Sequence, residues 1–492
     1  MSYATLISYI KKTTALDQVS GLLGWDQETQ MPVKGGVQRA EHMGAMESVL
    51  HARRTDIRIP GWIAAVDLST LNAVEKRNVS EAQKDYDNAT KIPADLAEAL
   101  ARLSALSQGI WANARKAGNF KDFAPTLTKM IDLKRQEASA RQTGNAPLYD
   151  ALMEDYEPGM ASDDMAALLA NLRPGLTDLR MRIADAGRPE FKLHGNFSEK
   201  LQMQFARTLP EIFNYDWDAG RMDLAVHPFC SGNGGDSRIT TRVSEQNPFD
   251  CIYSVIHEVG HAVYEQNITD ADTMAPAHKY ASMGVHESQS RMFENQIGRS
   301  REFCEFLFPK MQAAFGDIGV DNAEDFYKAV NNVQSGYIRT EADEVHYNLH
   351  IMMRFDLERA LISGDLSVND LEAAWNDRFK ADFGVTVDNP ANGVLQDVHW
   401  SVGLFGYFPT YSLGNIYAAE LFAKMQQTIP DLNGKIAAGR LDTPINWLHE
   451  NIHHHGRVLP PAELIEKATS HNTSESALLK YLDKKFGALY GV

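Results

Sequence analysis

Apolar side chains recur at the helical period along most of this chain, and that spacing favours a mainly α-helical fold. In the opening segment, Leu6, Ile7 and Ile10 show the pattern, and glycines such as Gly118 and Gly364 interrupt it farther along. The same pattern predicts helices over residues 2–53, 71–118, 122–141, 160–187, 198–213, 322–335, 344–364 and 368–380. Neither an internal repeat nor a low-complexity linker divides the sequence, so it predicts a single domain over residues 1–492.

Residues 216–243 depart from the helical pattern. Short β-favouring stretches alternate there with a turn of Gly, Asn and Ser, which predicts a hairpin or a small antiparallel sheet. A lone sheet in a helical protein often forms an edge beside a groove, and peptidases pair such an edge with an extended substrate backbone. The alternative is a hairpin with no ligand role, and the sequence does not decide between the two.

The charge balance and the cysteine content exclude several classes of protein. The chain has 65 acidic and 48 basic residues, for a formal charge of −17, whereas a nucleic-acid or anionic-membrane binder needs a basic surface. Cys230, Cys251 and Cys304 are too few for a disulfide framework and form no C-x-x-C pair. The first residues lack the layout of a secretion signal, and no apolar run approaches the ~18 residues of a membrane span. We therefore expect a cytoplasmic protein.

A metal-binding pattern lies in a predicted buried helix that begins at Asn247-Pro248, a plausible N-cap and first helical position. The helix contains His257-Glu258-Val259-Gly260-His261, an H-E-x-x-H pattern. Residues four apart share one helix face, so both imidazoles can bind one zinc ion. Glu258 then points beside that axis, where it can serve as the general base for the attacking water. Such polar residues in an apolar helix need a reason to be buried, which disfavours a chance match.

A catalytic zinc site needs a third protein ligand, and Glu287 is the main candidate. It lies 26 residues after His261, far enough for the first helix to end, a loop over residues 269–284 to cross, and a second helix to begin near His286. Glu294, two turns later on the same face, and the adjacent His286 are the alternatives. No third histidine follows at the short spacing of the metzincin pattern.

The chain resembles the carboxypeptidase Taq family of metallocarboxypeptidases over essentially its whole length. Besides H-E-x-x-H, short motifs follow one another in the family's order. They are His227-Pro228-Phe229, Asp236-Ser237-Arg238-Ile239-Thr240, His286-Glu287-Ser288-Gln289, Ile338-Arg339-Thr340-Glu341-Ala342-Asp343 and Gly393-Val394-Leu395-Gln396-Asp397-Val398-His399-Trp400. One such motif alone is weak, but together and in order they are specific.

The resemblance implies a fold and an activity. The family fold is a large, two-lobed, mainly helical body with a deep groove, similar to neurolysin and angiotensin-converting enzyme. We expect the small sheet to lie at the edge of the groove. The N-terminal helices, roughly residues 1–120, are expected to cover the groove. The implied activity is metal-dependent removal of single residues from peptide C-termini with broad specificity, by a homodimer. The family's third ligand matches Glu287, giving one zinc ion per subunit, for which cobalt or manganese could substitute.

The motifs supply candidates for substrate binding. A carboxypeptidase must recognise a free C-terminal carboxylate, and arginine does so through a forked, charge-assisted pair. Arg238 and Arg339 are the candidates, and the alternative for each is an internal salt bridge, with Asp236 or Asp343 as a partner. His227 could line the groove or anchor the hairpin.

The developing oxyanion also needs a donor. By analogy with related helical peptidases we favour His399 with Tyr411, and Tyr407 second, whereas core packing is the alternative role of each tyrosine. The tract of His453, His454 and His455 is expected to be structural or solvated rather than metal-binding. Two rival functions remain: a dipeptidyl carboxypeptidase or endo-oligopeptidase on the same scaffold, and a metal-stabilised binding protein without catalysis, against which the presence of Glu258 argues.

Overall fold

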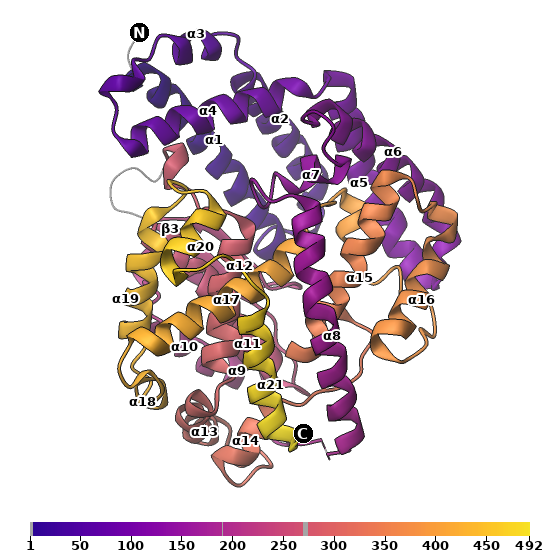
Figure 1. Ribbon diagram of the computed structural model, residues 1–492, viewed down its shortest axis with the longest axis vertical. Coiled ribbons are helices and arrows are strands. Elements are labelled where there is room, and N and C mark those ends of the chain that lie inside the picture. Colours follow the sequence, from indigo (N-terminus) through magenta and orange to yellow (C-terminus); the bar gives the residue numbers. More distant parts are fainter. Residues whose placement is uncertain (1–2, 189, 269–273) are drawn as a thin grey trace. The chain divides into compact units, whose positions relative to one another are not determined.

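A computed structural model describes residues 3–188, 190–268 and 274–492 (Figure 1). Helices make up 69% of the chain and the only sheet in those residues has three strands, so the prediction of a mainly α fold with a small sheet is confirmed. The chain forms two compact units. The first comprises Met1–Thr90, Phe191–Val330 and Tyr417–Thr473, and the second comprises Lys91–Glu190, Asn331–Ile416 and Ser474–Val492.

Prolines and glycines divide the first helical stretches. The predicted helix 2–53, whose first residue lies outside the described part, is two helices that end and begin around Pro32 and Gly35. The stretch 71–118 is divided at Pro93, and 198–213 is divided before Pro210. These helices are α1 (Tyr3–Thr29), α2 (Gly36–Arg54), α4 (Ala73–Lys91), α5 (Ala94–Ala117), α9 (Glu199–Ala206) and α10 (Leu209–Ile212).

Other helices of the first unit complete its core. Leu6 of α1 packs with Ile59 of α3, and with Val79 and Ala82 of α4, in a buried apolar cluster. The predicted helix 322–335 ends five residues early, at Val330. The remaining bounds are α3 (Ile59–Ala64), α13 (Arg301–Phe315), α14 (Ala323–Val330), α18 (Leu432–Ala437), α19 (Asp442–Asn451) and α20 (Pro461–Thr469).

The sheet of the first unit has the order β1-β3-β2, with β1 (Gly220–Leu224), β2 (Cys230–Asn233) and β3 (Asp236–Thr241). β2 and β3 form an antiparallel hairpin, as expected, but β1 and β3 are parallel, so the prediction of a wholly antiparallel sheet is wrong. The short connection after β1 reverses the chain, and β3 then inserts between β1 and β2. The central position suits β3 because Ile239, Thr240 and Thr241 are all buried.

Helix α11 (Pro248–Asn267) packs against β3 and against α12 (Met283–Arg291), which continues as a π-helix, η6 (Met292–Gly298) (Figure 1). The predicted cap of α11 is confirmed, since the Asn247 side chain accepts a hydrogen bond from the Phe249 N–H at 3.2 Å. Ser282 caps α12 through the Val285 N–H. Of the loop predicted between these helices, residues 269–273 lie outside the described part of the chain.

The second unit follows the predicted pattern closely. Its helix α15 (Glu344–Ser363) is capped by Asp343, whose carboxylate accepts from the Val345 and His346 N–H groups, and it ends at Gly364 in the left-handed conformation. Helices α8 and α16 pack against α15 (Figure 1). The other bounds are α6 (Ala124–Arg141), α7 (Leu148–Met153), α8 (Ser162–Ala186), α16 (Leu371–Phe383) and α21 (Ser476–Tyr490), while α17 (Pro409–Thr428) contributes residues to both units.

Candidate metal centre

The two histidines of the H-E-x-x-H pattern lie one turn apart on α11, with ring centroids 4.9 Å apart. The helix is apolar around them, and Ile256 and Val259 are fully buried. This burial fixes the roll of α11, so His257 and His261 point together toward α12. Glu258 is also buried.

Helix α12 brings Glu287 to the two imidazoles. Its Oε2 lies 3.7 Å from Nε2 of His257 and 3.4 Å from Nε2 of His261. Within the described residues, no other group of three His, Cys, Asp or Glu side chains has its ligand atoms within 4.8 Å of one another. The structure therefore brings together the three residues that the sequence selected as ligands.

Gly260 allows this approach of α12 to α11. A Cβ atom at Gly260 would lie 2.5 Å from Cα of Ser290 and 2.7 Å from the carbonyl oxygen of Gln289, both backbone atoms that cannot move aside. Only glycine fits such a close helix crossing. The spacing of the H-E-x-G-H sequence thus places the helix contact between its two histidines.

Glu294 and His286, the alternative ligands, lie behind the imidazoles instead. Oε2 of Glu294 is 2.9 Å from Nδ1 of His257, and Nδ1 of His286 is within hydrogen-bond distance of Nδ1 of His261. Glu294 belongs to η6, and the wider π-turn changes the helical register of Glu294 relative to Glu287. Both Nδ1 atoms are thus occupied, so the Nε2 atoms face Glu287.

The ionisation of Glu287, Glu294 and His261 favours a bound cation. Burial raises the pKa of Glu258 to about 7. Burial also works to raise the pKa of Glu287, but Arg291 and His257 hold it well below its usual range. The pKa of Glu294 is likewise lowered despite burial, mainly by Arg291. Burial lowers the pKa of His261 to about 3, so its imidazole is neutral at pH 7 and can act as a metal ligand.

The donor set fits a divalent metal such as zinc. Two atoms bound at ~2.1 Å to a tetrahedral zinc ion are ~3.4 Å apart, close to the two separations measured between Glu287 and the histidines. Two imidazoles and one carboxylate are a usual ligand set of catalytic zinc. The contacts of Glu294 and His286 with the Nδ1 atoms are typical of groups that orient metal ligands.

In the second unit, Arg339, Arg354 and Asp397 form a buried arginine cluster. Arg339 donates to Oδ1 of Asp397 through Nε and Nη2, at 3.1 and 2.9 Å, and Arg354 donates through Nε to Oδ2 at 2.6 Å. Burial lowers the pKa of Arg354 to about 10, which leaves it charged at pH 7. Two guanidinium groups therefore share one carboxylate. The partner of Arg339 is Asp397, whereas Asp343, which the sequence suggested, contacts His346.

The predicted oxyanion donors also belong to the second unit. Nε2 of His399 lies 3.4 Å from the hydroxyl oxygen of Tyr411, and the Tyr407 ring packs edge-on against that of Tyr411 at 5.2 Å. Burial and the Arg339 charge lower the pKa of His399 to about 3. His399 is therefore neutral at pH 7 and can donate one N–H.

Arg238 and His227 belong to the sheet region of the first unit. Arg238 donates to both carboxylate oxygens of Asp236, at 2.7 and 2.9 Å, so the ion pair that the sequence left open is formed. Its guanidinium also covers the ring of Trp25 in α1, 4.3 Å from the centroid. His227 is exposed in the connection between β1 and β2.

Several residues that the sequence did not single out support these sites. Arg291 donates to Glu287 at 2.7 Å and could have been recognised from its i,i+4 spacing. No local signal points to Arg354, because only the fold brings it to Asp397. The buried His453 lies 2.9 Å from Oε1 of Gln289, a contact that agrees with the structural role expected of that histidine.

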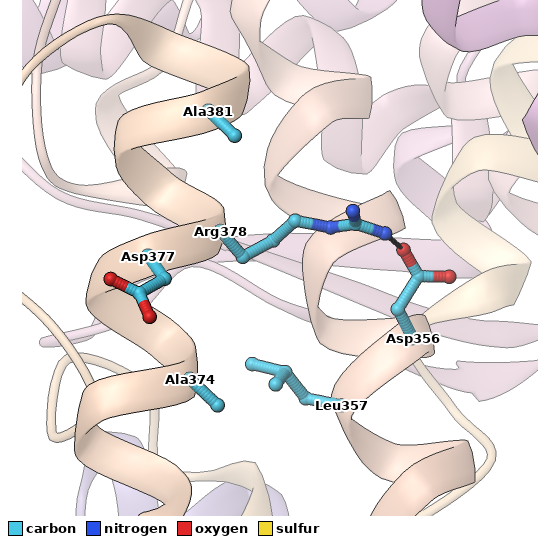
Figure 2. A pocket seen from close by; sticks show the side chains of 6 residues that line it. All are labelled: Asp356, Leu357, Ala374, Asp377, Arg378 and Ala381. Atoms are coloured by element: carbon cyan, nitrogen blue, oxygen red, sulfur yellow. Dashed lines mark hydrogen bonds and ion pairs between the residues drawn. The ribbon is translucent and has the colours of Figure 1, made fainter.

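A surface cavity of about 360 Å³ lies elsewhere in the second unit, between α15 and α16 (Figure 2). Figure 2 shows Arg378 reaching across it to form an ion pair with Asp356, while Asp377 points away from that pair. None of the predicted site residues lines this cavity. Among the described residues, every helix is too short or too polar to span a lipid bilayer.

Comparisons with known proteins place this arrangement in a family. The model of the carboxypeptidase Taq (M32) metallopeptidases matches residues 5–486. Thermostable carboxypeptidase 1 of Thermus thermophilus is 40% identical over 505 residues, which cover 100% of this chain and 99% of that protein. The solved M32 carboxypeptidase of Deinococcus radiodurans R1 matches with a TM-score of 0.95 at 36% identity, over 100% of this chain and 99% of that one. Metallocarboxypeptidase 1 of Trypanosoma cruzi matches with a TM-score of 0.95 at 32% identity, over 98% of this chain and 99% of that one.

Proposed function

Because the chain belongs to the carboxypeptidase Taq (M32) family of metallopeptidases, we propose that it is a zinc-dependent enzyme that removes single amino acids from peptide C-termini with broad specificity. The observation that carries the proposal is the convergence of His257, His261 and Glu287 within the first unit. These side chains would hold one ion per subunit, and cobalt or manganese could replace zinc. When bound, the ion would act as a Lewis acid that polarises the scissile carbonyl and lowers the pKa of the water that it binds.

Glu258 is the proposed general base. Its carboxylate would take a proton from the attacking water and pass that proton to the leaving amine. The pKa of about 7 supports this role, because a group that both accepts and donates a proton works best when its pKa is near the operating pH. Glu258 follows the ligand His257 directly in α11, so the same buried helix fixes both side chains.

We propose substrate-binding roles for several residues on chemical grounds. His399 and Tyr411, with Tyr407 beside them, would donate hydrogen bonds to the developing oxyanion. Arg339 or Arg238 would bind the terminal carboxylate. The surplus positive charge of the arginine cluster supports Arg339, whereas Arg238 already has Asp236 as a full partner. His227 is exposed and would contact the peptide.

Further proposals rest on the sequence and on the family resemblance. We propose a single catalytic domain over residues 1–492, a two-lobed body similar to neurolysin and angiotensin-converting enzyme, and a groove covered by the N-terminal helices, roughly residues 1–120. A homodimer and a cytoplasmic location complete these proposals.

One assay tests the activity. A short peptide and its C-terminal amide are incubated with the metal-loaded protein, and the products are identified by mass. We expect stepwise loss of single residues from the free acid and no cleavage of the amide. Internal cleavage of the amide would favour an endo-oligopeptidase, and release of residue pairs would favour a dipeptidyl carboxypeptidase. An intact peptide in the presence of bound metal would contradict the proposal.

A further inference from the structure

The imidazole of His261 ends a chain of buried contacts that the proposed mechanism does not use. Its Nδ1 faces Nδ1 of His286, and Nε2 of His286 lies 2.9 Å from Oε1 of Glu265. The chain crosses between helices, because Glu265 and His261 belong to α11 whereas His286 belongs to α12. The side chains of Glu265 and His286 are 9% and 11% exposed, so water contributes little to their hydrogen bonding.

The carboxylate at one end sets the direction of these hydrogen bonds. An ionised carboxylate only accepts, so Nε2 of His286 must donate to Glu265. Once Nε2 of His286 donates, the lone pair of that imidazole lies on Nδ1, and His261 has to donate its own Nδ1–H. The lone pair of His261 is consequently on Nε2, the atom that lies 3.4 Å from Oε2 of Glu287. The opposite direction would put a hydrogen on Nε2 and leave no ligand atom there.

From this geometry we infer that Glu265 and His286 are positioning residues that hold His261 in the tautomer able to bind the metal. The inference rests on the proposed metal function and deepens it. His257 has a shorter version of the same device, since its Nδ1 contacts the Glu294 carboxylate directly at 2.9 Å. The Nδ1 atom of each proposed histidine ligand is therefore linked to a carboxylate. For His257 the contact is direct, and for His261 it runs through the imidazole of His286.

Zinc affinity of the full-length protein, measured by competition with a chelator, tests the inference without relying on turnover. We expect Glu265→Gln and His286→Ala each to weaken zinc binding about 10–100-fold. The absorption spectrum of the cobalt-substituted protein should change in both variants, because the orientation of one ligand changes. His286→Gln should recover much of the affinity, since its amide can accept from His261 and donate to Glu265.

The double variant separates this role from a general loss of packing. If Glu265 acts through His286, Glu265→Gln should cause no further loss in a His286→Ala background. His453→Ala is the matched control, because this buried histidine contacts Gln289 of α12, the helix of His286, and its contact is with none of the three proposed zinc ligands. We expect the control to unfold at a lower temperature and to bind zinc as tightly as the wild type.

The outcomes separate the inference from the function on which it rests. If the wild type binds zinc and cleaves peptides, but Glu265→Gln leaves zinc affinity and the cobalt spectrum unchanged, the positioning role is wrong and the proposed function stands. Glu265→Gln is nearly isosteric, so it decides the matter even if His286→Ala fails to fold. A wild type that binds no zinc through His261 would overturn both.

Discussion

The metal centre and the arginine cluster have opposite surpluses of charge. Around His257 and His261, the carboxylates of Glu258, Glu287 and Glu294 outnumber the nearby guanidinium groups. In the second unit, the two arginines share the single carboxylate of Asp397. Burial makes such imbalances costly unless a partner of the opposite sign arrives. The first arrangement suits a cation, and the second suits an anion such as a peptide carboxylate.

Glu258→Gln gives the largest expected effect and tests the metal centre. The amide cannot take a proton, so we expect kcat to fall about 10²–10⁴-fold. Zinc content, measured by mass spectrometry of the metal, should stay at one ion per chain because Glu258 is not a proposed ligand. Glu245→Gln, at an exposed position ahead of the same helix, is the control and should leave both values unchanged. Loss of zinc from Glu258→Gln would show instead that this carboxylate binds the metal.

Asp397→Asn tests the arginine cluster. Removing the carboxylate leaves two buried guanidinium groups unpaired, and we expect the free energy of unfolding to fall by about 3–5 kcal/mol. Arg339 and Arg354 hold the pKa of Asp397 well below its usual range although burial opposes them, so its stabilising contribution is complete above the unfolded pKa of about 4.

That contribution should shrink as the pH falls below this value, because the folded carboxylate loses its advantage over the unfolded one. Urea unfolding at pH 7 and at lower pH should therefore show a difference between wild type and Asp397→Asn that narrows in acid. Asp377→Asn, at an exposed position of α16, should have a negligible effect at either pH. If Asp397→Asn lowered the free energy of unfolding no more than Asp377→Asn does, the charge imbalance proposed for the arginine cluster would be wrong.

The two regions also differ in how far the sequence alone predicted them. His257, Glu258 and His261 lie within five residues, so helical periodicity was enough to place the two histidines on one face and Glu258 beside them. Glu287 was found because a second helix was expected at a suitable distance along the chain. Arg354 and Asp397 are 43 residues apart, and no local pattern indicates that they meet. The parallel pairing of β1 with β3 was missed for the same reason, since strand order depends on contacts beyond each strand.

Gly260→Ala tests whether the metal centre depends on the close helix crossing. The added methyl group would meet the backbone of Ser290, so we expect overpacking to cost about 1–3 kcal/mol and zinc affinity to fall as α12 moves away with Glu287. Gly44→Ala is the control because nothing lies within 4 Å of its Cβ position in α2. There the helix should gain up to about 1 kcal/mol. Unchanged zinc binding in Gly260→Ala would show that Glu287 does not depend on this contact.

Asp236→Asn gives the smallest expected effect and separates the two candidate arginines. Its side chain is 59% exposed, whereas that of Asp397 is 13% exposed. Solvent and salt screen such a pair, so we expect the free energy of unfolding to change by less than about 1 kcal/mol, and by less still in high salt. The cation–π contact of Arg238 with Trp25 should keep the guanidinium in place.

The Michaelis constant (KM) of the Asp236→Asn variant then shows which of the two arginines binds the terminal carboxylate. If Arg339 binds the terminal carboxylate, KM for free-acid peptides should stay within about twofold of the wild type, because Arg339 belongs to a separate buried cluster whose charge is unaltered. A large change in KM at unchanged stability would show that Arg238 binds the terminal carboxylate of the peptide. Without the charge of Asp236, the guanidinium of Arg238 would be able to pair with a new carboxylate. If Asp236→Asn instead lowered the free energy of unfolding by several kcal/mol, the exposed ion pair of Asp236 would stabilise this fold as much as the buried pairs of Asp397, which would contradict the difference drawn between them.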